Sequence, residues 1–168
     1  MHRTILYGLL GLFLTFGALT RHMQAEDGEQ VRTWGRGFFA PGVVVDDWGS
    51  SASYFAMGVG GEGRLGDAPV LLSLDLAWLA PYRSLGNGFG EFCPGLGYSF
   101  GSGRTQPFIN GGYTLFFREG TASGLFFGGG VNHWINDHVG IGFEARDAVA
   151  VIDGTAHFIQ FRANVLFH

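Results

Sequence analysis

The last stretch of the chain, residues 157–167, alternates between apolar and polar side chains. Its sequence is HFIQFRANVLF. Every second residue from Ile159 to Phe167 is apolar, whereas the residues between them include Gln160, Arg162 and Asn164. Because successive strand residues point to opposite faces, this pattern predicts a strand with one apolar and one polar face. About ten residues is also the length that a tilted strand needs to cross a bilayer.

The same alternation recurs along the chain and predicts eight strands. We expect them at about residues 33–45, 54–65, 70–80, 88–100, 106–117, 123–134, 138–147 and 157–167. Pro41 cannot donate to a β ladder, so it implies a bulge or a weakened pairing in the first strand. The alternation is poorest in the sixth strand. The longer connections are expected at 46–53, 81–87 and 148–156, with short turns after the second, fourth and sixth strands. Such length alternation is typical of transmembrane barrels with short periplasmic turns.

The start of the chain reads as an export signal. Arg3 precedes an apolar stretch over residues 5–19, and Ala25 is a small residue suited to the position before a cleavage site. The apolar stretch is shorter than the roughly 20 residues of a spanning helix, although an N-terminal membrane anchor is the alternative. We therefore predict a signal peptide at 1–25, a polar periplasmic lead at 26–32 and a single barrel domain at 33–168.

The composition favours a protein whose surface meets lipid. The chain has 30 Gly, 17 Phe, a single Cys and no Lys, and 14% of its residues are charged, against about 25% in ordinary soluble domains. Only helices and closed barrels satisfy their backbone within lipid, and charged or Gly residues interrupt every apolar run after residue 25. A net charge of −4 without a basic cluster argues against nucleic acid as a partner.

Charged residues recur on the polar faces of the predicted strands, four of each sign. They are Arg36, Arg64, Arg146 and Arg162, and Glu62, Asp75, Glu91 and Glu144. An isolated buried ion costs several kcal/mol, whereas paired ions are tolerated. The interior of an eight-stranded barrel is just wide enough for side chains to fill. The pattern therefore predicts a lumen plugged by Arg–carboxylate pairs, with a gated ion or proton path as the alternative. Aromatics near the strand ends are predicted to form two interfacial girdles: Trp34, Tyr54, Trp78, Tyr82, Phe100 and Trp134.

Few motifs indicate chemistry. Gly58, Gly60 and Gly63 spell G-x-G-x-x-G, but no helix pattern follows, so they are read as small residues of a strand. The histidines lack zinc-site spacing, and no cofactor or metal site is predicted. The enzyme alternative is a lipid A-modifying barrel with a triad of Ser123, His157 and Glu144.

Two segments and the final strand carry a family resemblance. The segments are QPFINGGYTLFFR at 106–118 and FFGGGVNHWINDHVGIGFEARD at 126–147. They resemble the small outer-membrane β-barrel proteins of the porin-like, OmpA/OmpX-like superfamily. The resemblance implies an all-β, eight-stranded, antiparallel, up-and-down transmembrane barrel in the outer membrane of a Gram-negative cell. It also implies insertion by the barrel-assembly machinery, with Phe161, Val165 and Phe167 as the assembly signal, although His168 follows the terminal aromatic here.

These observations together indicate a monomeric outer-membrane barrel with a structural or surface-interaction role. Outer-membrane lipid is its predicted surrounding, and the exposed loops would carry any recognition of a surface ligand. The alternative from another class is a soluble exported barrel that binds a small apolar ligand, as lipocalins do. That alternative requires the apolar faces to point inward and the charges outward.

Overall fold

The computed structural model describes residues 32–65, 68–101, 103–151 and 154–168. The predicted signal peptide at 1–25 and nearly all of the predicted lead at 26–32 lie outside the described residues. Within the described ranges, no helix is long and apolar enough to cross a bilayer.

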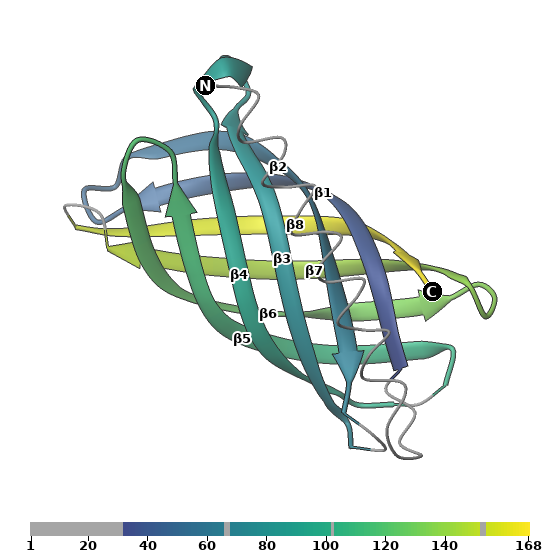
Figure 1. Ribbon diagram of the computed structural model, residues 1–168. Helices are drawn as coiled ribbons and strands as arrows, with labels where there is room; N and C mark the ends of the chain where they lie inside the picture. The colour runs from purple at the N-terminus through teal and green to yellow at the C-terminus, as the bar shows by residue number, and fades with distance from the viewer. Residues whose placement is uncertain (1–31, 66–67, 102, 152–153) are drawn as a thin grey trace.

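The described residues form eight strands and one short 3-10 helix. The strands are β1 (Arg32–Asp46), β2 (Ser51–Arg64), β3 (Val70–Pro81), β4 (Phe89–Ser99), β5 (Thr105–Phe117), β6 (Thr121–Trp134), β7 (Val139–Val151) and β8 (Thr155–Phe167), and the helix is η1 (Leu85–Asn87). Each strand pairs antiparallel with the next, and β8 pairs with β1 to close the barrel (Figure 1). The predicted eight-stranded up-and-down barrel is confirmed.

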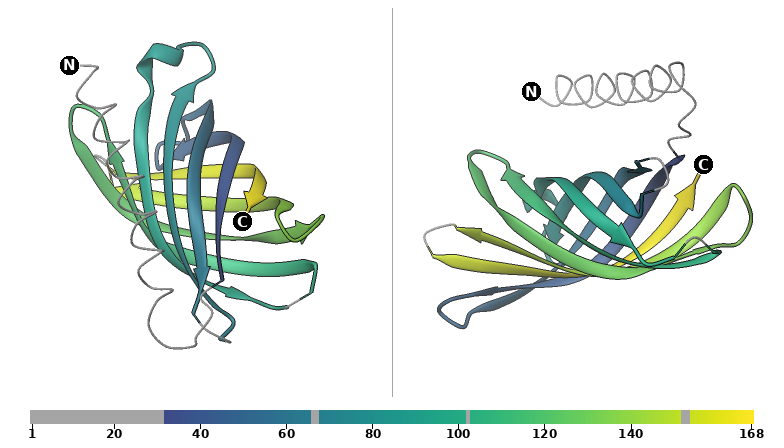
Figure 2. Two further views of the ribbon diagram at one scale, coloured as in Figure 1. Left: turned by 45° about the vertical axis from the view of Figure 1, so that its right-hand side comes forward. Right: turned by 90° about the horizontal axis from the view of Figure 1, so that it is seen from below.

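The connections are short at both ends of the barrel. We call the end where β1 begins and β8 finishes the termini end, and the other the loop end (Figure 2). The connections at the loop end are 47–50, 82–88, 118–120 and 152–154, and those at the termini end are 65–69, 100–104 and 135–138. The predicted alternation of long and short connections is wrong. Strand patterning simply continues into the predicted loops, because Val149 and Val151 alternate with Ala148 and Ala150 along β7.

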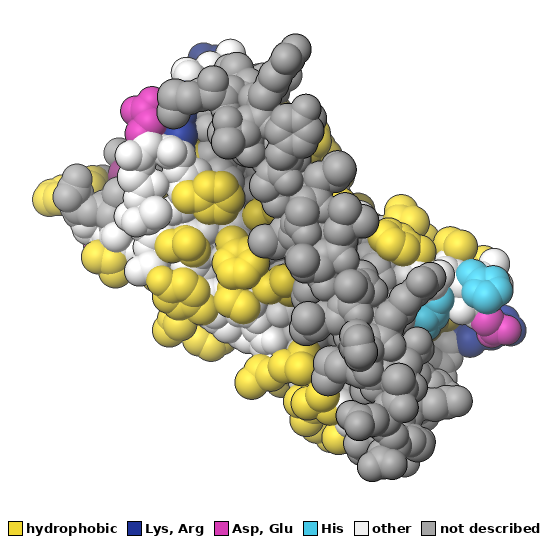
Figure 3. Space-filling view, viewed as in Figure 1, with side chains coloured by type: hydrophobic (Ala, Val, Ile, Leu, Met, Phe, Trp, Pro, Cys, Tyr) yellow, Lys and Arg dark blue, Asp and Glu magenta, His cyan; other side chains and the backbone are white. Residues whose placement is uncertain are grey.

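The outer face of the barrel is apolar on every strand. One side chain from each shows this, with exposures of 46–63%: Phe39, Met57, Leu72, Leu96, Ile109, Phe127, Phe143 and Phe161. Apolar side chains accordingly spread over the barrel wall (Figure 3). The sixth strand, where the alternation in the sequence is poorest, has the same facing rule, since Leu125 is exposed and Phe126 is fully buried. Asp147 shares the outer face, and its Oδ2 lies 2.9 Å from His157 Nδ1.

Proline interrupts the ladders without shifting their register. Between β1 and β8, the pairs Phe39–Ala163 and Gly42–Gln160 belong to one register, and no pair is formed by Pro41. The weakened pairing expected at Pro41 is present, and the alternative of a bulge is wrong. A proline nitrogen has no hydrogen to donate, so a ladder loses bonds locally while the strand continues.

Candidate functional site

Seven charged side chains meet in the middle of the barrel interior, and we call them the lumen network. They are Arg36 on β1, Glu62 on β2, Asp75 on β3, Glu91 on β4, Glu144 and Arg146 on β7, and Arg162 on β8. Each is at most 4% exposed. They share the inner face because each occupies the parity opposite to the exposed apolar residues of its own strand. The closed sheet then brings together groups that are far apart in the sequence.

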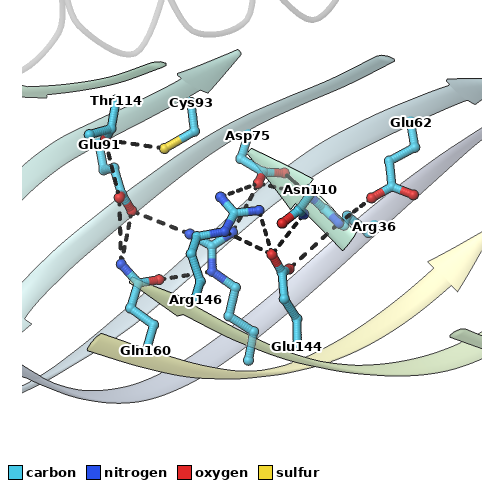
Figure 4. Close-up of polar contacts among 11 residues, drawn as sticks. Arg36, Glu62, Asp75, Glu91, Cys93, Asn110, Thr114, Glu144, Arg146 and Gln160 are labelled. Atoms are coloured by element: carbon cyan, nitrogen blue, oxygen red, sulfur yellow. Dashed lines mark hydrogen bonds and ion pairs between the residues drawn. The ribbon is translucent and has the colours of Figure 1, made fainter. Parts of the chain in front are cut away.

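Asp75 is the centre of this network (Figure 4). Arg36 donates to it from Nε at 2.9 Å and from Nη2 at 2.7 Å. Arg162 Nη1 and Arg146 Nη1 each lie 2.9 Å from Asp75 Oδ2. One carboxylate therefore compensates parts of three guanidinium groups, which is an arrangement that the forked shape of arginine allows.

The other carboxylates have fewer cationic partners. Glu144 Oε1 accepts from Arg146 Nε at 2.8 Å and from Asn110 Nδ2 at 2.9 Å. Glu91 accepts from Gln160 Nε2 at 3.2 Å and lies 3.4 Å from Arg162 Nη2.

Among the described residues, Glu62 has one hydrogen-bond partner, because its Oε1 accepts from Arg36 Nη1 and its Oε2 is unpartnered. Two guanidinium groups also lie over aromatic rings, Arg146 over Phe126 at 4.2 Å and Arg162 over Phe38 at 4.3 Å. Such contacts favour a cation that has left water.

Arg64 does not join the network, contrary to the prediction. Its Nη2 donates to the carbonyl of Gly101 at 3.2 Å, in the connection between β4 and β5. Arg64 has the inward parity, but it is the last residue of β2 and so lies at the termini end, beyond the level of the carboxylates. The predicted four-to-four balance of charges is therefore wrong for the network, which has three arginines and four carboxylates.

Apolar layers close the interior on both sides of the network. At the loop end, Tyr54, Phe89, Phe116 and Phe158 pack together, with Phe116 and Phe158 centroids 4.6 Å apart. At the termini end the layer contains Trp34, Leu71, Leu166 and Trp134. His168 stacks on Trp134 at a centroid distance of 4.8 Å. The described part of the interior is thus polar in the middle and aromatic at each end.

These layers correct the predicted girdles. Trp34 and Tyr54 are 7% and 5% exposed and face the lumen, and Trp134 packs with Trp34. Trp78, Tyr82 and Phe100 are exposed, as a girdle requires. The correct signal was present in the sequence, because Trp34 shares the parity of Arg36 and therefore had to point inward.

The hypothetical catalytic triad is not assembled. Glu144 is buried inside the barrel, whereas His157 lies on the outer face and bonds to Asp147. The opposite parity of their faces keeps the two side chains on different sides of the sheet. Cys93 is 1% exposed, and its Sγ lies 3.3 Å from Thr114 Oγ1. Within the described residues, no group of three or more His, Cys, Asp or Glu side chains could hold a metal ion.

The predicted assembly signal lies on the outer face of β8. Phe161, Val165 and Phe167 are 61%, 56% and 50% exposed. They therefore present a row of apolar side chains along the strand that closes the barrel. Their role in assembly stays a prediction.

Three solved structures resemble this barrel over most of its length. Neisserial surface protein A has 16% identity and a TM-score of 0.67, covering 83% of this chain and 99% of its own. The N-terminal β-barrel domain of Pseudomonas aeruginosa OprF has 12% identity and a TM-score of 0.59, covering 84% of this chain and 100% of its own. Ail, the attachment invasion locus protein of Yersinia pestis, has 13% identity and a TM-score of 0.51, covering 83% and 100%.

No protein-family model and no curated protein sequence matches the chain. The structural likeness, at these identities, concerns the fold. The chain therefore has the fold of the small outer-membrane β-barrels, as the resemblance of its sequence to the OmpA/OmpX-like proteins implied.

Proposed function

We propose that this protein is an integral outer-membrane barrel with a sealed interior and a structural or surface-interaction role. The observation that carries the proposal is the distribution of polarity across the wall. Large apolar side chains are exposed on all eight strands, and the lumen network is buried inside. Soluble monomers rarely expose contiguous apolar patches larger than a few hundred Å². A soluble lipocalin-like barrel needs the opposite facing.

We also propose an orientation of the barrel in the outer membrane. The termini end faces the periplasm and the loop end faces the outside, as in outer-membrane barrels with an even number of strands. Export uses the predicted signal peptide, and the barrel-assembly machinery recognises β8. The Asp147–His157 pair lies toward the loop end of the outer face. That position is compatible with the headgroup region, where a charged side chain costs much less than at the middle of the bilayer.

The loop end offers one candidate contact for a surface ligand. Trp48, in the connection 47–50, is 82% exposed. Its neighbour Asp47 accepts a hydrogen bond from the Thr155 backbone NH at 2.7 Å and donates its own NH to the Thr155 carbonyl at 3.1 Å. The connection 47–50 is thus joined to the start of β8 next to an exposed indole ring. A large apolar side chain held in this way favours contact with a partner.

Fractionation and heat modifiability test the membrane assignment. The full chain is expressed in a Gram-negative host, and boiled and unboiled outer membranes are compared on a denaturing gel. We expect the protein in the outer-membrane fraction and a shifted band without boiling. A protein found in the soluble periplasm, with no shift, would contradict the proposal. A steady conductance above background in a planar bilayer would contradict a sealed lumen.

Cysteine labelling tests the orientation. Trp48→Cys lies at the loop end and His138→Cys at the termini end, and both are placed in the Cys93→Ser background. A membrane-impermeant maleimide is applied to intact cells. We expect labelling of Trp48→Cys alone, and of both variants after the outer membrane is permeabilised. Labelling of His138→Cys alone on intact cells would reverse the orientation.

A further inference from the structure

The lumen network has one more carboxylate than it has arginines. Arg36, Arg146 and Arg162 face four acids, and Arg64 is bonded elsewhere. Arginine stays charged in proteins, so the network carries one negative charge if every acid is ionised. That charge would be enclosed between two aromatic layers, and an uncompensated buried charge costs several kcal/mol. The interior therefore needs one further positive charge.

Two acids of the lumen network have a buried oxygen without a hydrogen-bond partner among the described residues, Glu62 Oε2 and Glu144 Oε2. Both oxygens of Asp75 and of Glu91 accept hydrogen bonds. Buried polar atoms are nearly always partnered, so these two oxygens mark Glu62 and Glu144 as the acids whose charge is least compensated. They belong to residues of β2 and β7, which meet only across the lumen.

The two acids flank the same nitrogen. Glu62 Oε1 bonds to Arg36 Nη1, and Glu144 Oε2 lies 3.8 Å from that atom. Figure 4 shows both carboxylates directed at Arg36. Glu62 and Glu144 thus both face the single charge of Arg36, and nearby like charges disfavour each other's ionised form out of water.

We propose that the lumen network binds one proton, with Glu62 as the acid. The proton comes from solvent and neutralises the Glu62 carboxylate, while Glu144 stays ionised. Glu144 is the ionised member of the pair because Arg146 and Asn110 already donate to it. Among the described residues, Glu62 accepts from Arg36. One proton thus makes the network neutral.

Arg36 on β1, Arg146 on β7 and Arg162 on β8 are the cations that face this pair. Asp75 on β3 is anionic but is already compensated by these three guanidinium groups. Arg64 follows Glu62 by two residues on β2 but donates to the Gly101 carbonyl. A monovalent cation such as Na⁺ is the rival source of positive charge, because Asn132 Oδ1 and Asn164 Oδ1 are also unpartnered. The test separates the two.

The test compares Glu62→Gln with the wild-type chain refolded into phosphatidylcholine vesicles and unfolded with urea. An unfolded Glu is ionised above about pH 5, whereas the folded protein keeps the proton. The folded state then binds one more proton, so the wild-type unfolding constant increases about tenfold per pH unit relative to the variant. The ratio of the wild-type unfolding constant to that of Glu62→Gln is measured from pH 5 to 8, in choline chloride and in NaCl. Gln has the shape of the neutral acid, so Glu62→Gln is expected to keep the barrel.

Infrared spectroscopy provides a second readout that does not depend on the variant's stability. A carbonyl band of a protonated carboxyl group is expected in the wild-type barrel and absent from Glu62→Gln. Glu144→Gln, the matched control, removes the acceptor of Arg146 and is expected to unfold at lower urea at every pH. A pH-independent ratio together with no carboxyl band overturns the proposal. Stabilisation of the wild type by NaCl over choline chloride, without the band, assigns the charge to a cation instead.

This inference concerns the interior and does not depend on the surface role. The heat shift of each sample reports whether the barrel has formed, independently of its protonation. A barrel that shows the shift but no proton overturns the inference alone, whereas a chain that never shows the shift contradicts the membrane proposal itself.

Discussion

Replacing Asp75 is expected to have the largest effect on stability among single changes in the lumen network. Asp75→Asn keeps the shape of the side chain and removes its charge. Asp75 is 2% exposed, and three guanidinium groups lie within 2.9 Å of its oxygens. Removing one partner from a buried ion pair costs about 3–5 kcal/mol, because the remaining charge stays buried. Ionisation of Glu62 would restore neutrality but not the geometry, so we expect about 3 kcal/mol.

Urea titration of the barrel in phosphatidylcholine vesicles measures this loss, with tryptophan fluorescence and the heat shift as two probes. The expected change is roughly a hundredfold in the unfolding constant, since 1.4 kcal/mol corresponds to a factor of ten. Arg64→Gln is the control. Arg64 donates to the Gly101 carbonyl, and a bond of this kind contributes about 1 kcal/mol. A loss for Asp75→Asn no greater than that of Arg64→Gln would refute the assignment of Asp75 as the centre of the network.

Three further changes probe the wall and the interior. A Cβ at Gly130 would meet the Phe143 carbonyl oxygen, whereas a Cβ at Gly37 would have open space. In urea titrations, Gly130→Ala should therefore reduce the free energy of unfolding by about 1–3 kcal/mol, and Gly37→Ala by much less. Equal losses for the two variants would contradict this packing. Phe161 is 61% exposed, so Phe161→Arg should lose about 2–4 kcal/mol in vesicles, and an unchanged titration would place it outside the lipid. Cys93 should react with a maleimide only after boiling, and labelling of the unboiled barrel would contradict its burial.

The parity of each strand was readable from the sequence. Every second residue from Ile159 to Phe167 is apolar, and these residues lie on the outer face of β8. The same rule holds in the least regular strand, where Phe126 is inside and Phe127 is outside. The ends of the strands were harder to predict from the sequence, because strands continue beyond the membrane-crossing segment wherever the alternation continues. The residues 148–156 therefore read as a loop but are mostly strand.

The aromatic end layers show where sequence reasoning was incomplete. A tryptophan near a strand end suits either an interfacial girdle or the mouth of the lumen, and only its parity relative to the charged residues of the same strand distinguishes the two. Trp34 is therefore buried against Trp134, whereas Trp78 is 44% exposed. The prediction for Arg64 was wrong for a related reason, because parity indicates the face on which a residue lies but not its height along the barrel.

The sequence alone determined the periodicity, and with it the fold class and the face that carries the lumen charges, because alternation is a local property of a strand. The tertiary structure decided which of these charges meet. Closure of the sheet and the tilt of its strands bring Arg36, Asp75 and Arg162 into contact from β1, β3 and β8, and leave Arg64 outside the network. Only the tertiary structure shows that the network has one carboxylate more than it has arginines. The height of a residue along the barrel depends on the register between strands rather than on the pattern of any one strand.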